Sequence, residues 1–176
     1  DARAAVLQLC HKADVLLENF RPGTMKTFGL DYESVRQQNP AVVYVSMSGF
    51  GQNTPWSTRP AFAPTVQAES GATQTQMDHF GDDLLQPVTD WASHADVYTG
   101  LEGAIAVLAG LNKRNATGTG LHGDVSMMAT MLAVNERLHA QINELDASDE
   151  PLALGAPESP IFKVADGSFV TIAASP

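Results

Sequence analysis

Two stretches of the 176-residue sequence carry side chains that could do chemistry. The first is SHADVYTGLEGAIAVLAG, residues 93–110, in which Asp96 precedes an apolar run with the spacing of a buried helix. An aspartate at such a position is a favoured N-cap, and a carboxylate that is free to react can also act as a nucleophile. The residues around Asp96 leave both roles open.

The second stretch is ENFRPGTMKTFGL, residues 18–30, which follows a short apolar segment. Open α/β sheets bind ligands outside the carboxyl ends of their strands, so this turn lies where a ligand is expected. Asn19 offers an amide, Arg21 a guanidinium suited to phosphate, and Lys26 a second cation one turn later. The same residues are also consistent with a plain strand-to-helix turn, broken by Pro-Gly, whose cations are solvated.

Other motifs point away from nucleotide and metal chemistry. GTGLHG, residues 118–123, matches the glycine pattern of dinucleotide sites, but that pattern needs a strand before it and a helix after it. Here a helix leads in and a strand leads out, which favours a plain αβ turn. The five histidines lack metal-ligand spacing, and the single cysteine, Cys10, excludes a cysteine-rich zinc site, so we expect no metal.

The elements that must position these side chains alternate in the manner of an α/β fold with parallel strands. In the first third we expect a helix ending near residue 13, a strand within 14–20, a helix over 32–39 capped by Asp31 and a strand within 41–51. A short helix over 64–71, a polar loop over 73–92 and a helix over 97–111 are expected to follow. The last part should contain a strand after residue 120, a helix over 127–143 and a β-hairpin around Asp166-Gly167.

The helix expected over 97–111 is predicted to bury one apolar face, with small residues such as Gly100 and Gly103 allowing close packing. That face comprises Val97, Leu101, Ala104, Ile105, Leu108 and Leu111.

Charge and composition narrow the classes of partner. The net charge is −10, but residues 1–60 carry six Lys/Arg against five Asp/Glu and residues 61–176 carry four against fifteen. An anionic ligand is therefore expected in the first third, and neither nucleic acid nor a membrane is an expected partner. The lone cysteine suggests a reducing, cytoplasmic compartment. Because the sequence begins at Asp1 and stops within a strand-like run, we expect a piece of a longer protein, which leaves an organellar targeting segment open.

Three stretches, in order, resemble signatures of the family III CoA-transferases, which include formyl-CoA transferase and carnitine-related enzymes and are related to α-methylacyl-CoA racemase. They are ADVLLENFRPGTMKTFGLDYESVRQQNPAVVYVSMSGFG, ADVYTGLEGAIAVLAGLNKRNATGTG and GDVSMM. The resemblance implies a Rossmann-like large domain over 1–145, an acidic linker over 146–160 and the start of a smaller α+β domain over 161–176. It also implies an interlocked homodimer for the full-length protein.

The resemblance further implies that Asp96 is the nucleophile of CoA transfer from an acyl-CoA thioester to a small carboxylic acid. A carboxylate can attack a thioester to form a mixed anhydride, which CoA thiolate reopens to an enzyme-CoA thioester. The resemblance also implies CoA-binding residues in the family turn, namely Asn19, Phe20, Arg21 and Gly23, with Lys26 in the short helix that follows.

Two alternatives remain open at this point. A racemase of the same superfamily needs a second proton-transfer group, a histidine, but its position is occupied by Phe62, whose phenyl ring cannot carry a proton. This observation favours the transferase. A CoA-binding module without turnover is the other alternative.

Overall fold

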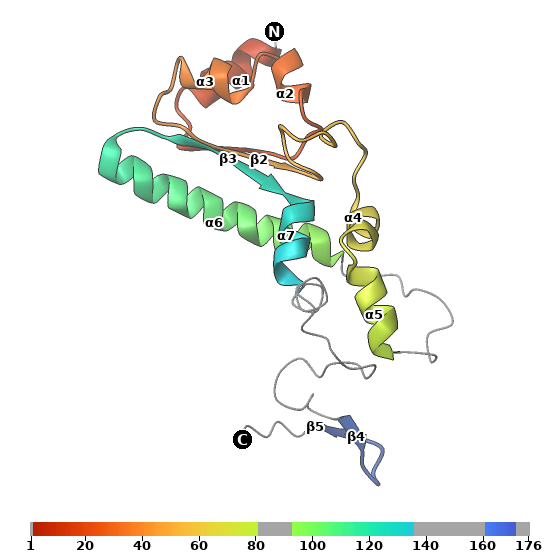
Figure 1. Ribbon diagram of the computed structural model, residues 1–176. Helices are drawn as coiled ribbons and strands as arrows, with labels where there is room; N and C mark the ends of the chain where they lie inside the picture. The colour runs from red at the N-terminus through yellow and green to blue at the C-terminus, as the bar shows by residue number, and fades with distance from the viewer. Residues whose placement is uncertain (1, 81–92, 136–160, 172–176) are drawn as a thin grey trace.

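The computed structural model describes residues 2–80, 93–135 and 161–171. Strands β1 (Val15–Glu18), β2 (Val43–Ser48) and β3 (Leu121–Ser126) form a parallel sheet in the order β1-β2-β3 (Figure 1). In the register, Glu18 lies opposite Ser46, and Ser46 lies opposite Asp124. The expected α/β architecture with parallel strands is confirmed.

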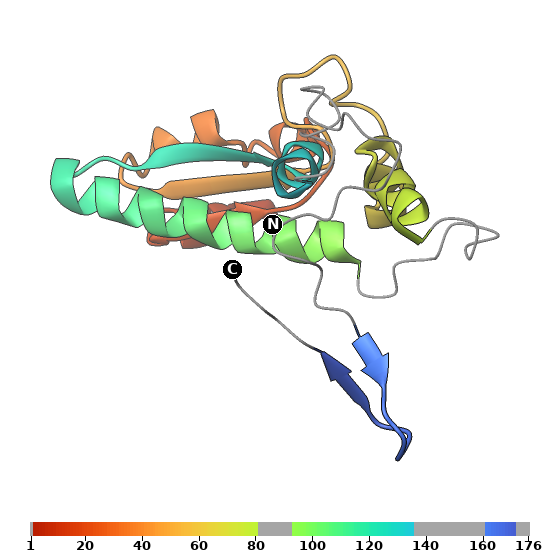
Figure 2. The ribbon, with the colours of Figure 1, turned by 60° about the horizontal axis from the view of Figure 1, so that its bottom comes forward.

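Helices cover both faces of this sheet. Helices α1 (Ala2–Cys10), α2 (Thr24–Thr27) and α3 (Tyr32–Arg36) lie on one face, and the long helix α6 (His94–Thr117) runs along the other (Figures 1 and 2). Because side chains alternate along a strand, β2 sends Tyr44 toward α1 and α3, and Val43 and Val45 toward α6. The central strand is thus buried on both faces, which is typical of parallel sheets.

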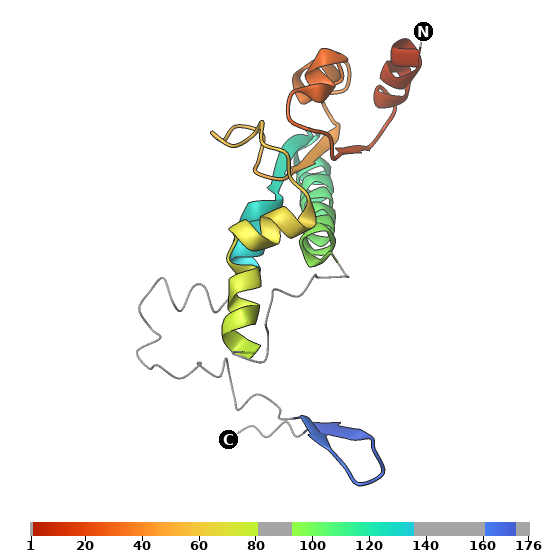
Figure 3. The same ribbon diagram turned by 90° about the vertical axis from the view of Figure 1, so that its right-hand side faces the viewer.

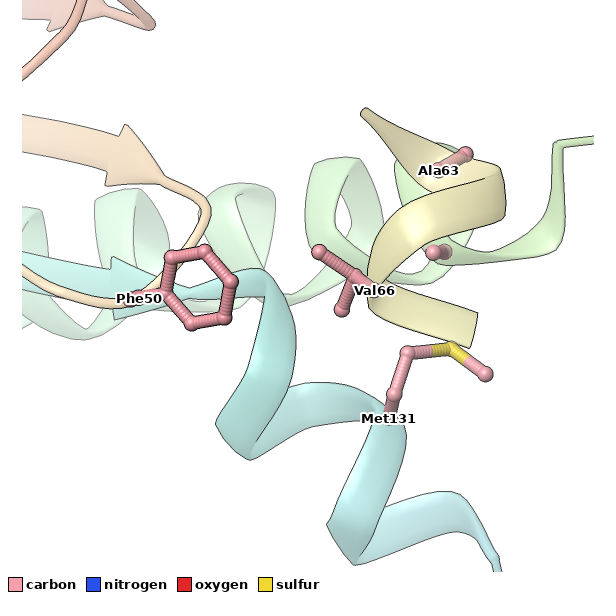
Figure 4. Packing of buried hydrophobic residues seen from close by; sticks show 5 residues of the cluster. Phe50, Ala63, Val66 and Met131 are labelled. Carbon is pink, nitrogen blue, oxygen red and sulfur yellow. The ribbon is translucent and has the colours of Figure 1, made fainter. Parts of the chain in front are cut away.

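The remaining helices gather at the carboxyl end of the sheet. They are α4 (Ala63–Glu69), α5 (Ala72–Phe80) and α7 (Met127–Val134), and α4 and α5 follow one another beside α7 (Figure 3). A cluster of buried side chains joins the end of β2, α4, the first turn of α6 and α7 (Figure 4); its members are Phe50, Ala63, Val66, Ala95 and Met131. This cluster fixes the beginning of α6 relative to the strand ends.

Several sequence predictions about helix limits were wrong or only partly right. Helix α3, expected over 32–39, ends at Arg36. Residues 73–80 belong to α5 rather than to a polar loop, while 81–92 lie outside the described residues. Helix α7 ends at Val134 with Asn135 as its C-cap, short of residue 143, and 136–143 lie outside the described residues. Helix α6 is longer at both ends than the expected 97–111.

The prediction of the buried face of α6 was also wrong, except at Leu111, which is partly buried against the sheet. Val97, Leu101, Ile105 and Leu108 are 50–66% exposed, whereas the face against the rest of the fold carries Ala95, Thr99, Gly103 and Gly110. The reason is steric: a Cβ at Gly103 would stand 2.6 Å from the Met47 sulfur, and one at Gly110 would overlap Val43. Helix and sheet approach so closely that only small residues fit between them.

Two turns confirm local predictions. Residues 118–120 connect the end of α6 to β3 as an αβ turn, with Gly118 in the left-handed region at φ 75°, and residues 121–123 already belong to β3. Strands β4 (Ile161–Lys163) and β5 (Phe169–Thr171) form the expected antiparallel hairpin, whose turn contains Gly167 at φ 86°. The expected linker over 146–160 lies outside the described residues.

Candidate active site

A cavity of about 430 Å³ lies at the carboxyl ends of the three strands. Each strand contributes the residues at or just beyond its end: Asn19–Pro22 after β1, Met47–Gly49 at the end of β2 and Met127 after β3. The loop after β2 and the first turns of α6 complete the lining with Ser57, Arg59, Ala61, Phe62, Asp96, Thr99 and Gly100. This is the edge at which open α/β sheets bind ligands.

Four of the six site residues expected from the sequence line this cavity. Asn19, Phe20 and Arg21 reach it from the turn after β1, and Asp96 reaches it from α6, 75 positions further along the chain than Arg21. Gly23 and Lys26 do not line it. Gly23 occupies the left-handed region at φ 86° and serves as the N-cap of α2, and Lys26 is exposed on that helix.

The turn after β1 is held by a buried carboxylate. Glu18 is only 7% exposed, and its Oε2 accepts a hydrogen bond of 2.8 Å from the backbone N–H of Phe20. Beyond this bond the chain turns through Gly23, whose positive φ would strain an L-residue with a side chain. Asn19, Phe20 and Arg21 all have exposed side chains, so the turn presents an amide, a ring and a guanidinium to a ligand.

Asp96 is not the cap of α6, in contrast to the simplest interpretation of the sequence. The N-cap is Ser93, at φ 48°, and Asp96 is the third residue of the helix, with its backbone N–H 2.9 Å from the Ser93 carbonyl oxygen. The Asp96 side chain is exposed and makes no hydrogen bond or ion pair with the described residues. Its carboxylate lies in the first turn, where the helix dipole favours negative charge.

The first turn of α6 is itself anchored by buried groups. Ala95 is fully buried, and its backbone N–H donates to Gln67 Oε1 of α4 at 3.3 Å. One turn later the Thr99 hydroxyl donates to the Ala95 carbonyl oxygen at 2.6 Å. The backbone on either side of Asp96 is therefore fixed by hydrogen bonds to buried groups, while Asp96 itself lines the cavity.

Sequence reasoning missed the contribution of the loop between β2 and α4. The guanidinium of Arg59 lies over the rings of Phe50 and Trp56, at 5.0 and 5.2 Å from their centroids, and forms an ion pair with Glu69 of α4. A polar segment rich in Pro, Ser and Thr gave no sign that its one cation would enter a cavity. The only local signal was the presence of aromatic residues at short spacing before Arg59, which can stack with a guanidinium.

Phe62 lies in the same cavity as Asp96 and is 68% exposed. Among the described residues, the lining contains no histidine. The proton-transfer group that a racemase would need beside Asp96 is thus not supplied by the part of the wall that the structure describes.

Two further features are absent from the described residues. No group of three or more His, Cys, Asp or Glu side chains in them is arranged to hold a metal ion. None of their helices combines the length and the apolar character that crossing a membrane requires.

Comparison with known proteins gives the family. The family model for CoA-transferase family III matches residues 1–176. A succinate–glutarate CoA-transferase of Agrobacterium fabrum is 34% identical over 152 residues, which cover 86% of this chain and 36% of that protein. An acetyl-CoA:oxalate CoA-transferase of Acetobacter aceti is 40% identical over 131 residues, 74% of this chain and 33% of that enzyme. The chain thus spans about a third of the length of these curated relatives.

Solved structures agree in fold. A CAIB/BAIF family protein from Brucella suis superposes with a TM-score of 0.76 and 31% identity over 95% of this chain and 44% of that chain. Rv3272 from M. tuberculosis superposes with a TM-score of 0.71 and 30% identity over 84% of this chain and 39% of that one. With the family model matched from the first residue to the last, the chain belongs to CoA-transferase family III.

Proposed function

We propose that the complete protein transfers CoA from an acyl-CoA thioester to a free carboxylic acid, with Asp96 as the covalent nucleophile. The observation that carries this proposal is that the exposed Asp96 carboxylate and the Asn19–Arg21 turn line one cavity at the carboxyl ends of the strands. A carboxylate nucleophile and a phosphate-binding turn in one cavity are what such a transfer requires.

The reaction balances without a redox step or a further reactant. The Asp96 carboxylate attacks the thioester carbonyl, forms an aspartyl-acyl anhydride and expels CoA thiolate. The thiolate then attacks the aspartyl carbonyl, which gives an aspartyl-CoA thioester and releases the donor acid as a carboxylate. The acceptor carboxylate attacks that thioester and expels the thiolate again, and the thiolate finally takes the acceptor acyl group from the new anhydride, which restores Asp96.

Each site residue predicted from the sequence has a part in this scheme. Arg21 and Asn19 bind phosphate oxygens or amide groups of CoA, and Phe20 offers an exposed ring to its apolar parts. The Asp96 carboxylate, in the first turn of α6, is the group that attacks the thioester. Gly23 shapes the turn, and Lys26 stands outside the cavity, where it meets only those parts of CoA that extend past α2.

The relatives support small carboxylic acids as the exchanged groups, since their names specify succinate, glutarate and oxalate. We also propose that the complete protein is a homodimer. The exposed apolar face of α6, with Leu101, Ile105 and Leu108 each more than half exposed, supports contacts beyond the described fold.

The test is to incubate the complete protein with a panel of acyl-CoA thioesters and free acids and to follow new acyl-CoA species by mass spectrometry. Exchange that requires both a thioester and an acid is the expected result. The same reactions run in deuterated water report the racemase alternative: rapid deuterium incorporation at the α-carbon without CoA exchange would contradict the proposal. CoA binding with neither reaction would indicate a binding module.

A further inference from the structure

We propose that Arg59 binds the distal carboxylate of a dicarboxylic acyl group, so that this protein prefers dicarboxylic over monocarboxylic substrates. The inference rests on the proposed function of the cavity, and it assigns a binding role to a residue of the loop between β2 and α4. It begins from the charges of the cavity lining, where the described residues comprise two cations, Arg21 and Arg59, and one anion, Asp96.

The two arginines reach the cavity from separate segments. Arg21 belongs to the exposed turn after β1. The Arg59 side chain instead lies against the Phe50 and Trp56 rings and forms an ion pair with Glu69 of α4. CoA brings phosphates, which suit the exposed turn with its amide and guanidinium. Although Arg59 already pairs with Glu69, its guanidinium lies in another part of the cavity wall from Arg21 and offers a second position for an anionic group of the ligand.

The Arg59 guanidinium is held in one orientation before any ligand binds. It lies 5.0 and 5.2 Å from the centroids of the Phe50 and Trp56 rings, and these two rings meet edge to face at 5.8 Å. An Nη2 hydrogen bond to Glu69 Oε1 fixes one edge of the fork. A guanidinium has five N–H donors, so donors remain for a second carboxylate. Such preorganisation lowers the entropy lost on binding.

The loop that carries Arg59 is also fixed at its beginning. Asp124 of β3 accepts the backbone N–H of Gln52 at 2.9 Å, and the Thr54 hydroxyl donates to the Phe50 carbonyl oxygen at 2.9 Å. The first bond ties the beginning of the loop to the sheet, and the second holds the loop on itself, so both restrict the position of the segment that leads to Arg59.

The rest of the lining suits a short hydrocarbon chain between two carboxylates. Met47, Phe62 and Met127 provide apolar wall, and Thr99 and Gly100 lie close to Asp96 on α6. A dicarboxylic acyl group would place its thioester carbonyl at Asp96 and its free carboxylate at Arg59. A monocarboxylic acyl group would leave the guanidinium without that partner, and sites built for a polar group reject analogues that lack it.

The experiment compares acids of matched chain length as CoA acceptors in the complete protein. Oxalate, succinate and glutarate are each paired with the monocarboxylate of equal carbon number, namely acetate, butyrate and valerate. The donor throughout is one monocarboxylic acyl-CoA, which has no distal carboxylate for Arg59 to bind. The variant is Arg59→Gln and the control is Arg36→Gln. Arg36 likewise lies over an aromatic ring, Tyr32 at 5.6 Å, and pairs with Glu33 at 2.8 Å, but it stands outside the cavity lining.

The wild-type protein should prefer a dicarboxylate over its matched monocarboxylate. Arg59→Gln should lower kcat/KM for that dicarboxylate roughly 10- to 100-fold, the scale of a lost hydrogen bond to a charged group, and leave the monocarboxylate within about twofold. Arg59→Lys, which keeps a cation but not the planar fork, should retain part of the preference. Arg36→Gln should change neither acid.

Three results would overturn the assignment while leaving CoA transfer in place. Equal losses for both acids in Arg59→Gln and Arg59→Lys would mean that Arg59 only anchors the loop. A raised KM for the acyl-CoA donor, with either acid, would assign Arg59 to the CoA phosphates. A wild-type preference for monocarboxylates at every length would exclude a dicarboxylate site. By contrast, absence of CoA transfer to any acid would remove the proposed function itself.

Discussion

Replacing Asp96 by asparagine separates the chemical role of this residue from its structural one. Asparagine keeps the size of the side chain and removes its charge. The Asp96 carboxylate is exposed and makes no hydrogen bond or ion pair with the described residues, so the structural loss is limited to its favourable position in the first turn of α6. That contribution amounts to about 0.3–1 kcal/mol of the free energy of unfolding.

The expected loss of activity is much larger. An amide does not attack a thioester at a useful rate, so Asp96→Asn should lower the rate of acyl exchange by about 10⁴-fold or more, as removal of a covalent nucleophile does elsewhere. The matched control is Glu102→Gln on the same helix, an exposed carboxylate that does not line the cavity. This control should exchange acyl groups at the wild-type rate.

The covalent intermediate can be observed directly. The complete protein is mixed with acyl-CoA, quenched with hydroxylamine and digested with Glu-C, which releases residues 70–102 as one peptide. An aspartyl hydroxamate at Asp96 in that peptide is the expected product, and Asp96→Asn should lack it. Glu102→Gln should carry it in a longer peptide, residues 70–136, because this variant loses the cleavage site at residue 102. The nucleophile assignment would be refuted if Asp96→Asn stayed active and the wild-type protein gave no modified peptide.

Three further predictions concern the ligand turn, the packing of the sheet and a buried phenol. Arg21→Ala in the complete protein should weaken CoA binding by about 1.5–3 kcal/mol, measured by calorimetric titration. Arg36→Ala is the control and should bind CoA as the wild type does. An unchanged Kd in Arg21→Ala would remove Arg21 from the site. Gly120→Ala should lower the free energy of unfolding in urea by about 1–3 kcal/mol or more because its Cβ would overlap the Val42 carbonyl oxygen. Gly100→Ala, with nothing within 4 Å of its Cβ, should not be destabilising. Equal stability of the two variants would contradict the observed packing. Burial raises the pKa of Tyr44 above its ordinary value of 10.0, so the unfolded state releases this proton first and stability should fall as the pH rises above 10. Tyr44→Phe should cost about 1 kcal/mol at neutral pH, through loss of the hydroxyl bond to the Leu30 carbonyl oxygen, and should flatten that alkaline decline in urea unfolding.

Local signals sufficed for the sheet and for the turn that follows β1. Strand β2 follows from the β-branched and aromatic residues around Tyr44, which glycines end. The turn after β1 follows from the Pro-Gly pair after Arg21. Tertiary packing did not override these short-range preferences. The rule that ligands bind at the carboxyl ends of parallel strands then placed Asn19 and Arg21 correctly at the edge where the cavity lies.

What could not be predicted depends on distances between segments far apart in the chain. The position of Arg59 in the cavity follows from its ion pair with Glu69 and from stacking on Phe50 and Trp56, and no periodic pattern encodes these contacts. Helix α5 was mistaken for a loop because its first residues are polar and lack an apolar stripe.

The wrong prediction of the buried face of α6 and the position of Asp96 in the cavity lining have one physical cause. Periodicity selects the large apolar residues as the buried face, but the sheet selects the opposite face because it approaches the helix closely enough to require Gly103 and Gly110. Residues four apart in a helix share a face, so Asp96 stands one turn from Gly100, which also lines the cavity and has open space around it. A larger side chain at residue 100 would fill the space beside the carboxylate. Small residues along α6 thus bring the helix against the sheet and leave open space in the cavity beside Asp96, which the proposed reaction requires.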